Sequence, residues 1–326
     1  MKSKLYFYPS IVIFIIILLY TTILHQNDSI TVQADIDSNE QLYTPLESDG
    51  KTLHIYYFYL DYVQKSGSSM LIYTPEGYSV LIDAGITESS SLLSGYLNHL
   101  GIEKIDAAIA THPHHDHIGG YLRLLDEDKI RQFYMPNVDH VSDIYQEWIE
   151  KIGEHAIPYE FLYANQSIKL GNSLTIKVLN PSENQLKTLD GSYSVADINN
   201  LSLVLKLEYG NHSFLFTGDI YDEQEEKLIA SYGDELKATV VEAPHHGGRT
   251  SSSTNFIRQV SPEYVIMNAN VLQSLSILRR YEILGVSVLP TDIYGTVHLQ
   301  TDGETLKIMT EYNSPPTDKM RHIPPS

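Results

Sequence analysis

Four histidines and one aspartate within six residues, at positions 112–117, constrain this chain more than any other feature. The stretch reads His-Pro-His-His-Asp-His and follows an apolar run at 107–110 that predicts a buried strand. An extended segment aims His112 and His114 to one side, whereas Asp116 and His117 turn toward a second point. Imidazole and carboxylate are ligands that a borderline cation such as Zn²⁺ accepts. We therefore expect a metal site, to which the fold must bring further ligands.

Two later strands are also predicted to end in groups that could bind a metal. The apolar run at 214–216 is followed by Thr-Gly and then Asp219, and the run at 240–241 leads to His245 and His246. In layered α/β proteins, functional groups gather beyond the ends of strands. A lone aspartate at a strand end is often a helix cap, and lone histidines are often surface residues. Together with the first cluster, one shared site is the better explanation.

Strand and helix patterns alternate from about Thr52 onward, which predicts a layered α/β protein. Strands are expected at 53–60, 69–74, 79–82, 107–110, 132–135, 174–179, 201–208, 213–216, 239–242, 264–267 and 287–289, with a terminal hairpin at 296–310. Helices are expected at 89–100, 142–155, 222–231, 253–260 and 272–284.

Composition limits the ligands and the partners. The chain has no cysteine, so a metal site must use His, Asp, Glu or Asn. The formal net charge of −19 attracts cations and repels polyanions, which disfavours a long nucleic acid as partner without excluding a local basic patch.

The N-terminal residues predict a membrane segment. Residues 5–24 carry no charge, Lys2 and Lys4 precede them, and an acidic stretch follows. The positive-inside rule then places the chain as a single-pass cell-membrane protein with its catalytic domain outside, or as a secreted protein if the segment is cleaved near 32–34. We therefore expect an anchor or signal at 1–25, an acidic linker at 26–51, the catalytic domain at 52–312 and a flexible tail at 313–326.

These motifs resemble the metallo-β-lactamase superfamily. The resemblance rests on the HxHxDH stretch, an upstream Asp-Ala-Gly at 83–85, Thr-Gly-Asp at 217–219 and Pro-His-His-Gly at 244–247. Their order is similar to the lactamase-like domain of the competence protein ComEC and to the phosphorylcholine esterase domain, both of which cleave phosphodiesters. The resemblance implies a four-layer αββα sandwich and a hydrolase that uses two divalent ions, Zn²⁺ foremost and Mn²⁺ second.

The resemblance also implies roles for single residues. His112 and His114 would hold one metal, and Asp116 and His117 the other. Either His245 or His246 would join the second pair, and we favour His245. The remaining positions follow in the same way: Asp219 would bridge both metals, Asp83 would orient the cluster, and Asn199 and Asn200 stand where many members carry one more metal histidine.

The expected reaction is hydrolysis of a phosphodiester or related ester by a hydroxide that both metals share. Arg249 could grip a phosphate, and His246 or Asp292 could give a proton to the leaving group, while Asp116 serves catalysis through its metal. A small-molecule or cell-envelope substrate is expected. The alternatives are a lactonase or β-lactamase-type hydrolase and a non-catalytic metal-binding surface protein. The sequence does not fix the oligomeric state.

Overall fold

The computed structural model describes residues 42–62, 67–171, 174–188 and 193–312. The chain divides into two units, residues 1–31 and residues 32–326, and all described residues belong to the second. The predicted anchor at 1–25, the linker up to residue 41 and the tail from 313 lie outside the described residues.

The predicted location is corrected by the structure. Among the described residues, no helix is both long enough and apolar enough to cross a bilayer. This finding contradicts the single-pass location with an outside catalytic domain, and the apolar run at 5–24 that suggested it lies outside the described ranges.

The first of two sheets has eight strands in the order β15-β14-β1-β2-β3-β4-β5-β6. Its strands β1 to β3 and β14 to β15 pair antiparallel, whereas β3 to β6 run parallel. The bounds are β1 Leu53–Tyr57, β2 Met70–Tyr73, β3 Ser79–Ile82, β4 Ala107–Ile109, β5 Phe133–Met135, β6 Tyr159–Phe161, β14 Val297–Thr301 and β15 Leu306–Thr310.

The second sheet has seven strands in the order β13-β12-β11-β10-β9-β8-β7. Strands β10 to β13 run parallel, so their carboxyl ends meet at one edge of the sheet. The bounds are β7 Ser167–Leu170, β8 Leu174–Asn180, β9 Val204–Tyr209, β10 His212–Phe216, β11 Val240–Glu242, β12 Tyr264–Met267 and β13 Ser287–Pro290.

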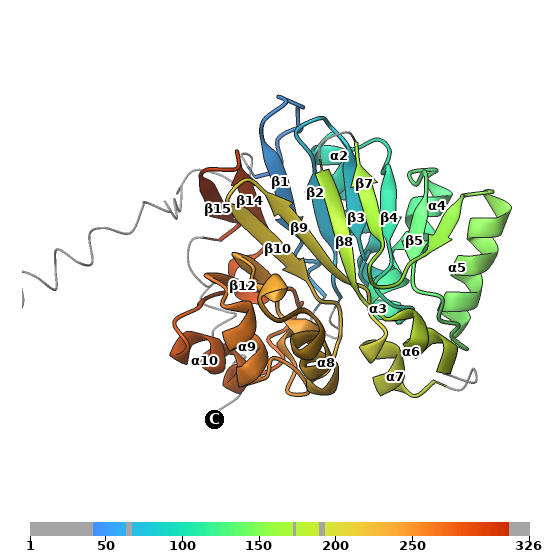
Figure 1. Ribbon diagram of the computed structural model, residues 1–326. Helices are drawn as coiled ribbons and strands as arrows, with labels where there is room; N and C mark the ends of the chain where they lie inside the picture. Colours follow the sequence, from blue (N-terminus) through green and yellow to red (C-terminus); the bar gives the residue numbers. More distant parts are fainter. Residues whose placement is uncertain (1–41, 63–66, 172–173, 189–192, 313–326) are drawn as a thin grey trace, which may run out of the picture. The chain divides into compact units, whose positions relative to one another are not determined.

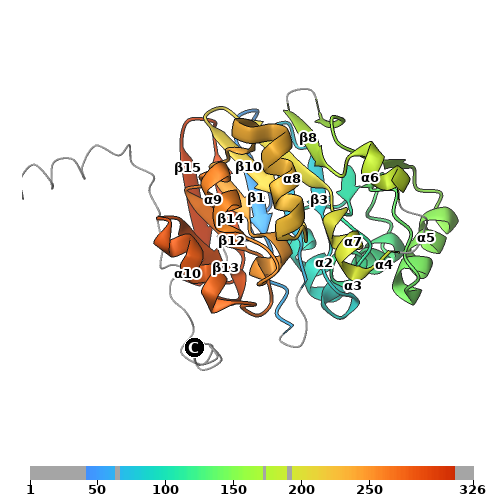
Figure 2. The ribbon, with the colours of Figure 1, turned by 60° about the horizontal axis from the view of Figure 1, so that its bottom comes forward.

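Separate groups of helices pack against the two sheets (Figures 1 and 2). Apolar residues of α2, α4 and α5 form one core cluster with the first sheet, and those of α8, α9 and α10 form another with the second. The bounds are α2 Ser90–His99, α3 His115–Ile118, α4 Tyr121–Asp126, α5 Asp143–Glu154, α6 Glu183–Thr188, α7 Val195–Asn200, α8 Asp222–Tyr232, α9 Thr254–Val260, α10 Leu275–Ile283 and α11 Thr291–Tyr294, with short 3₁₀ turns η1 Thr87–Ser89, η2 Gly233–Leu236 and η3 Pro244–Gly247.

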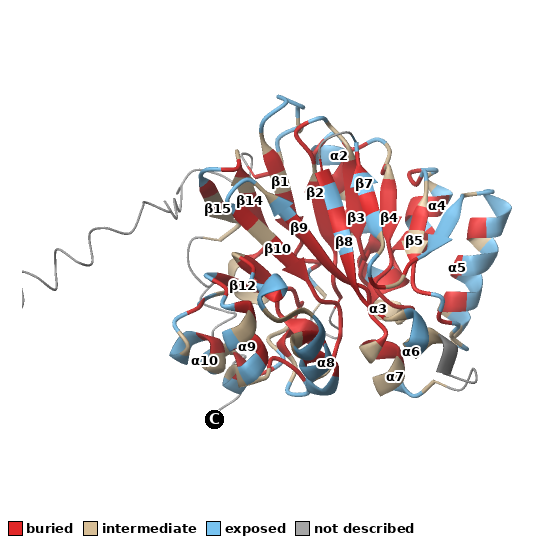
Figure 3. Ribbon diagram, in the orientation of Figure 1, coloured by how far each residue is buried: buried red, intermediate tan, exposed pale blue. Residues whose placement is uncertain are grey.

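Burial explains why these segments adopt their structure. The central strands of both sheets are mostly buried and the edge strands β6 and β7 expose residues, whereas the helices bury one face and expose the other (Figure 3). Tyr57 of β1 and Phe216 of β10 pack with ring centroids 6.2 Å apart, which joins the inner faces of the two sheets. Helix α5 is amphipathic, and Ser142 caps it by accepting the backbone N–H of Tyr145. The mixed α/β arrangement with two sheets confirms that part of the predicted fold class, whereas the predicted N-terminal helix lies outside the described residues.

Residues 42–51, which the sequence analysis placed in the linker, pack against the domain. The ring of Tyr43 stacks on Tyr96 at 4.7 Å, and its hydroxyl donates to Thr296 Oγ1 at 2.6 Å. The backbone N–H of Leu46 donates to the carbonyl of Leu100 at 2.9 Å. The folded region therefore includes residues before Thr52.

Candidate metal centre

The cluster residues and their downstream partners all lie just beyond strand ends. His112 follows β4, Asp116 and His117 lie in α3, and Asp219 follows β10. His246 follows β11, the parallel neighbour of β10, so these two groups emerge at the same edge. The glycines after the first cluster have a steric reason, because a Cβ on Gly120 would lie 2.1 Å from the carbonyl oxygen of Ala84.

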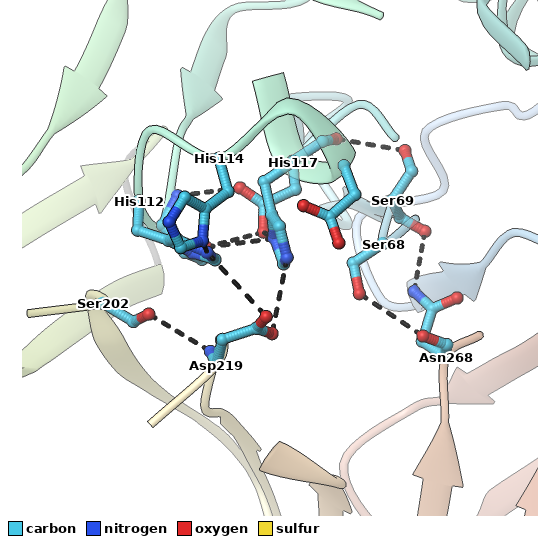
Figure 4. Close-up of polar contacts among 12 residues, drawn as sticks. Ser68, Ser69, His112, His114, His117, Ser202, Asp219 and Asn268 are labelled. Atoms are coloured by element: carbon cyan, nitrogen blue, oxygen red, sulfur yellow. Dashed lines mark hydrogen bonds and ion pairs between the residues drawn. The ribbon is translucent and has the colours of Figure 1, made fainter. Parts of the chain in front are cut away.

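The orientation of His117 is fixed by Asp83. The Nδ1 of His117 lies 2.7 Å from Asp83 Oδ2, which directs its Nε2 toward Asp219 Oδ1 at 3.4 Å (Figure 4). Asp83 is fully buried, and it also accepts the backbone N–H and the hydroxyl of Thr111, each at 2.7 Å. Burial raises the pKa of Asp83, and the adjacent His117 opposes that rise. These contacts are those of a side chain that could orient His117, and the orienting role of Asp83 stays a prediction.

His246 is oriented in a similar way by the second sheet. Its Nδ1 lies 2.9 Å from the backbone carbonyl of Asn268, and because a carbonyl can only accept, Nδ1 carries the proton. The lone pair of a neutral ring is then on Nε2, which lies 3.4 Å from Asp116 Oδ2 and 3.6 Å from Asp219 Oδ2. Within the described ranges, Nε2 of both His246 and His117 is buried without a hydrogen-bond partner.

Asp116, His117, Asp219 and His246 form what we call the four-residue group. Each offers one ligand atom, and these atoms all lie within 4.8 Å of one another. Two buried imidazole nitrogens without partners, facing two carboxylates, are what a divalent cation requires. The donor set therefore fits a metal ion.

The electrostatics of the four-residue group favour positive charge between the carboxylates. Burial opposes ionisation of Asp219, but His246 and His117 outweigh it and hold the pKa of Asp219 well below its usual range. Burial alone would lower the pKa of His246, but Asp219 and Asp116 raise it to about 9. In the metal-free protein, protons on the imidazoles thus take the place of a cation.

His112, His114 and His245 form a second set, the three-histidine group. His112 Nε2 lies 3.0 Å from His114 Nδ1 and 3.8 Å from Asp219 Oδ2. His245 Nε2 is also 3.8 Å from Asp219 Oδ2, while its Nδ1 lies 2.6 Å from Thr250 Oγ1. Asp219 therefore faces imidazoles of both groups, as a carboxylate shared by two metal sites would.

The structure separates the two histidines between which the sequence left a choice. His246 is buried within the four-residue group, whereas His245, the residue that we favoured, is partly exposed and faces Asp219 from the other group. Both residues have a left-handed backbone, with φ of 53° at His245 and 55° at His246. This pair of unusual conformations splays adjacent side chains apart, which a sequence pattern does not reveal.

The other predicted residues lie outside the four-residue group. Asn200 Oδ1 accepts the backbone N–H of Tyr221 at 2.9 Å and so supports the turn after Asp219. Asn199 is buried at the end of α7. Asp292 accepts the backbone N–H of Leu272 at 2.8 Å and is not in the four-residue group. Arg249 is exposed in the loop after η3.

Sequence reasoning missed several residues at the centre. His140, in the loop before α5, has its ring 5.5 Å from that of His114. Ser68 Oγ lies 3.2 Å from His246 Nδ1, and Glu242 is buried at the end of β11. The sequence did contain a signal for Glu242, because it ends an apolar strand that is expected to be buried. A buried ionisable side chain requires compensating contacts, so its presence there indicates a specific role.

Comparisons with known proteins identify the family of this chain. A model of the metallo-beta-lactamase superfamily matches residues 63–267, which confirms the resemblance predicted above. ComE operon protein 3 of Bacillus subtilis (strain 168) is 32% identical over 259 residues, covering 71% of this chain and 31% of that protein. Competence protein ComA of Neisseria gonorrhoeae is 26% identical over 243 residues, covering 71% of this chain and 30% of that protein. The chain thus spans about a third of the length of these relatives.

A solved structure supports the fold. The metallo-beta-lactamase fold protein YhfI from Bacillus subtilis superposes with a TM-score of 0.51 and 15% sequence identity. The match covers 77% of this chain and 100% of YhfI. At this identity the likeness concerns the fold alone.

Proposed function

Because the chain belongs to the metallo-β-lactamase superfamily, we propose that this metal-dependent hydrolase cleaves phosphodiesters. The observation that carries the proposal is the four-residue group, in which the buried Nε2 atoms of two imidazoles face two carboxylates. The phosphodiester substrate is more specific than the family membership and needs separate support. It is supported by the similarity to competence proteins and by an exposed arginine three residues after His246 in the sequence.

The proposed ligands divide between two ions. Asp116, His117 and His246 would hold one divalent ion, and His112 and His114 would hold the other, with Asp219 shared. Zn²⁺ is the first candidate and Mn²⁺ the second, since imidazole and carboxylate accept both. When bound, such ions supply Lewis acidity and a water nucleophile at neutral pH.

Other residues of the chain would orient the metal ligands and bind the substrate. Asp83 and the carbonyl of Asn268 keep the Nδ1 protons of His117 and His246 in place, so both rings present Nε2 to the centre. His246 is therefore proposed as a ligand instead of a proton donor. Arg249 lies three residues after it and could hold a non-bridging phosphate oxygen through its guanidinium fork. The net charge of −19 favours a small phosphodiester over a long nucleic acid.

The proposal is tested on the full chain with defined metal content. Protein stripped with a chelator and reloaded with Zn²⁺ or Mn²⁺ is assayed on bis(p-nitrophenyl) phosphate, a p-nitrophenyl ester and nitrocefin. We expect turnover of the phosphodiester only with metal, and a loss of at least ~10³-fold in Asp219→Ala, because both ions lose a ligand. Turnover of nitrocefin instead of the phosphodiester would transfer the assignment to the lactamase-type alternative, and equal activity in Asp219→Ala would remove the shared role of Asp219.

A further inference from the structure

Glu242 is a buried carboxylate to which the proposed reaction assigns no role. It is the last residue of β11, and its exposed fraction is only 2%. Burying a carboxylate costs free energy unless hydrogen bonds or opposite charges compensate. The contacts of Glu242 therefore indicate what it does.

Both oxygens of Glu242 reach toward the metal centre. Oε2 accepts the backbone N–H groups of Thr217 at 3.0 Å and Gly218 at 3.3 Å, the two residues directly before Asp219. Oε1 accepts from the hydroxyl of Ser68 at 3.4 Å. The same hydroxyl lies 3.2 Å from Nδ1 of His246. Glu242 thus supports the turn that leads to the proposed ligand Asp219. It also contacts Ser68, which in turn contacts the proposed ligand His246.

Glu242 in the second sheet corresponds to Asp83 in the first. Asp83 binds the backbone N–H of Thr111 and the Nδ1 of His117, and Glu242 binds backbone N–H groups and reaches His246 through Ser68. Burial raises the pKa of Glu242 to about 7, and the nearby Asp83 adds to that rise. Each sheet therefore contributes one buried carboxylate beneath the centre.

We propose that Glu242 is a positioning residue that holds Asp219 and His246 in the geometry for binding metal. This inference rests on the proposed metal centre. Glu242 acts by fixing the backbone of Thr217 and Gly218, since displacement of that turn would move the Asp219 carboxylate away from His117. It also acts through Ser68, which contacts the protonated nitrogen of His246.

The test compares Glu242→Gln and Glu242→Ala with a matched control in the full chain. The control is Glu225→Gln, because Glu225 is also buried and accepts two successive backbone N–H groups, those of Ser252 and Ser253. Affinity for Mn²⁺ and Co²⁺ is measured by chelator competition, and the visible spectrum of the Co²⁺ protein reports ligand geometry. Melting of the metal-free proteins shows whether each variant folds.

We expect a graded loss of metal affinity. Glu242→Gln keeps one acceptor for the two N–H groups and should bind metal about tenfold more weakly, whereas Glu242→Ala should approach about 100-fold. Both should change the Co²⁺ spectrum. Ser68→Ala, which removes only the link to His246, should have an effect no larger than that of Glu242→Gln. Glu225→Gln should keep the affinity and spectrum of the wild type.

The contrary outcomes are distinct. Wild-type affinity and spectrum in folded Glu242→Gln and Glu242→Ala would overturn the positioning role while leaving the proposed hydrolase intact. An equal loss in Glu225→Gln would also overturn it, because the effect would then be general to buried carboxylates. If the wild-type chain binds neither ion, the proposed metal centre fails, and the inference fails with it.

Discussion

The two halves of the metal centre are built differently, although they share Asp219. In the four-residue group, both imidazoles have Nδ1 bound to a fixed acceptor, so Nε2 points at the carboxylates before any ion arrives. In the three-histidine group, Nδ1 of His112 contacts Thr111 Oγ1 at 3.1 Å, but its Nε2 lies 3.0 Å from Nδ1 of His114, and His245 is held by a hydroxyl of an exposed residue. Preorganised ligands bind with less loss of conformational freedom. We therefore expect the four-residue group to bind its ion more tightly.

The largest expected effect distinguishes the adjacent histidines. His246→Ala removes a ligand from the buried group and should weaken the tighter site by more than the roughly 10–100-fold that loss of an outer partner costs. His245→Ala should weaken binding at the tighter site far less, because His245 is not in the four-residue group. Metal titration followed by mass spectrometry of bound ions measures both. A greater loss of the tighter ion in His245→Ala than in His246→Ala would reverse the comparison.

The next largest effect is expected at Asp83, which contacts His117 of the four-residue group. Asp83→Asn keeps the size of the side chain but weakens its hydrogen bond to His117, so the tighter site should bind metal about 10–100-fold more weakly. The weaker site should change less, and chelator competition at two metal concentrations separates the two affinities. An effect confined to the weaker site would show that Asp83 does not act through His117.

A third prediction concerns pH. The pKa of His246 is raised to about 9 in the metal-free protein, above the value of about 6.5 for a free histidine. Below pH 9 a cation must displace this proton, and Asp219 and Asp83 also raise the pKa of His117 well above its usual value, so apparent metal affinity should rise by at least about tenfold from pH 7 to pH 8. Calorimetry in buffers of different ionisation enthalpy counts the protons released. A flat profile between pH 7 and pH 9 would contradict the raised pKa.

The smallest effect is expected outside both groups. Arg249→Ala should raise KM for the phosphodiester by about tenfold or less, with little change in kcat and none in metal content, because Arg249 is exposed and holds no proposed metal ligand. Steady-state kinetics with metal-loaded protein checks this. Arg249→Lys is the matched control for charge, and a large drop in kcat would place the guanidinium in the reaction itself.

The sequence predicted most of the strands because their apolar runs are short and bounded by turn residues. Strands β3 and β12 have the predicted bounds, and α5 differs by one residue at each end. Strands β6 and β7 were missed because both are short edge strands, and all three residues of β6 are exposed. Expectation and structure also differ at residues 42–51, where tertiary packing of Tyr43 decides the boundary.

The candidate ligands within one sequence motif could be predicted. The residues whose role depends on contacts between distant segments could not. The motif at 112–117 and Asp219 could be named because strand ends gather at one edge of a sheet. The choice between His245 and His246 could not be made, because it depends on two consecutive positive φ angles. Glu242 and Ser68 act through contacts between residues 174 positions apart, which a single sequence does not encode as a pattern.

The left-handed pair at His245 and His246 also has an evolutionary consequence. Each such residue is disfavoured by about 1–2 kcal/mol relative to right-handed geometry, and glycine would relieve most of that cost. A replacement by glycine would thus raise the stability of the metal-free protein but remove an imidazole. Selection for stability and selection for activity therefore favour different residues at positions 245 and 246. A homologue under selection for stability alone could lose its activity at these positions.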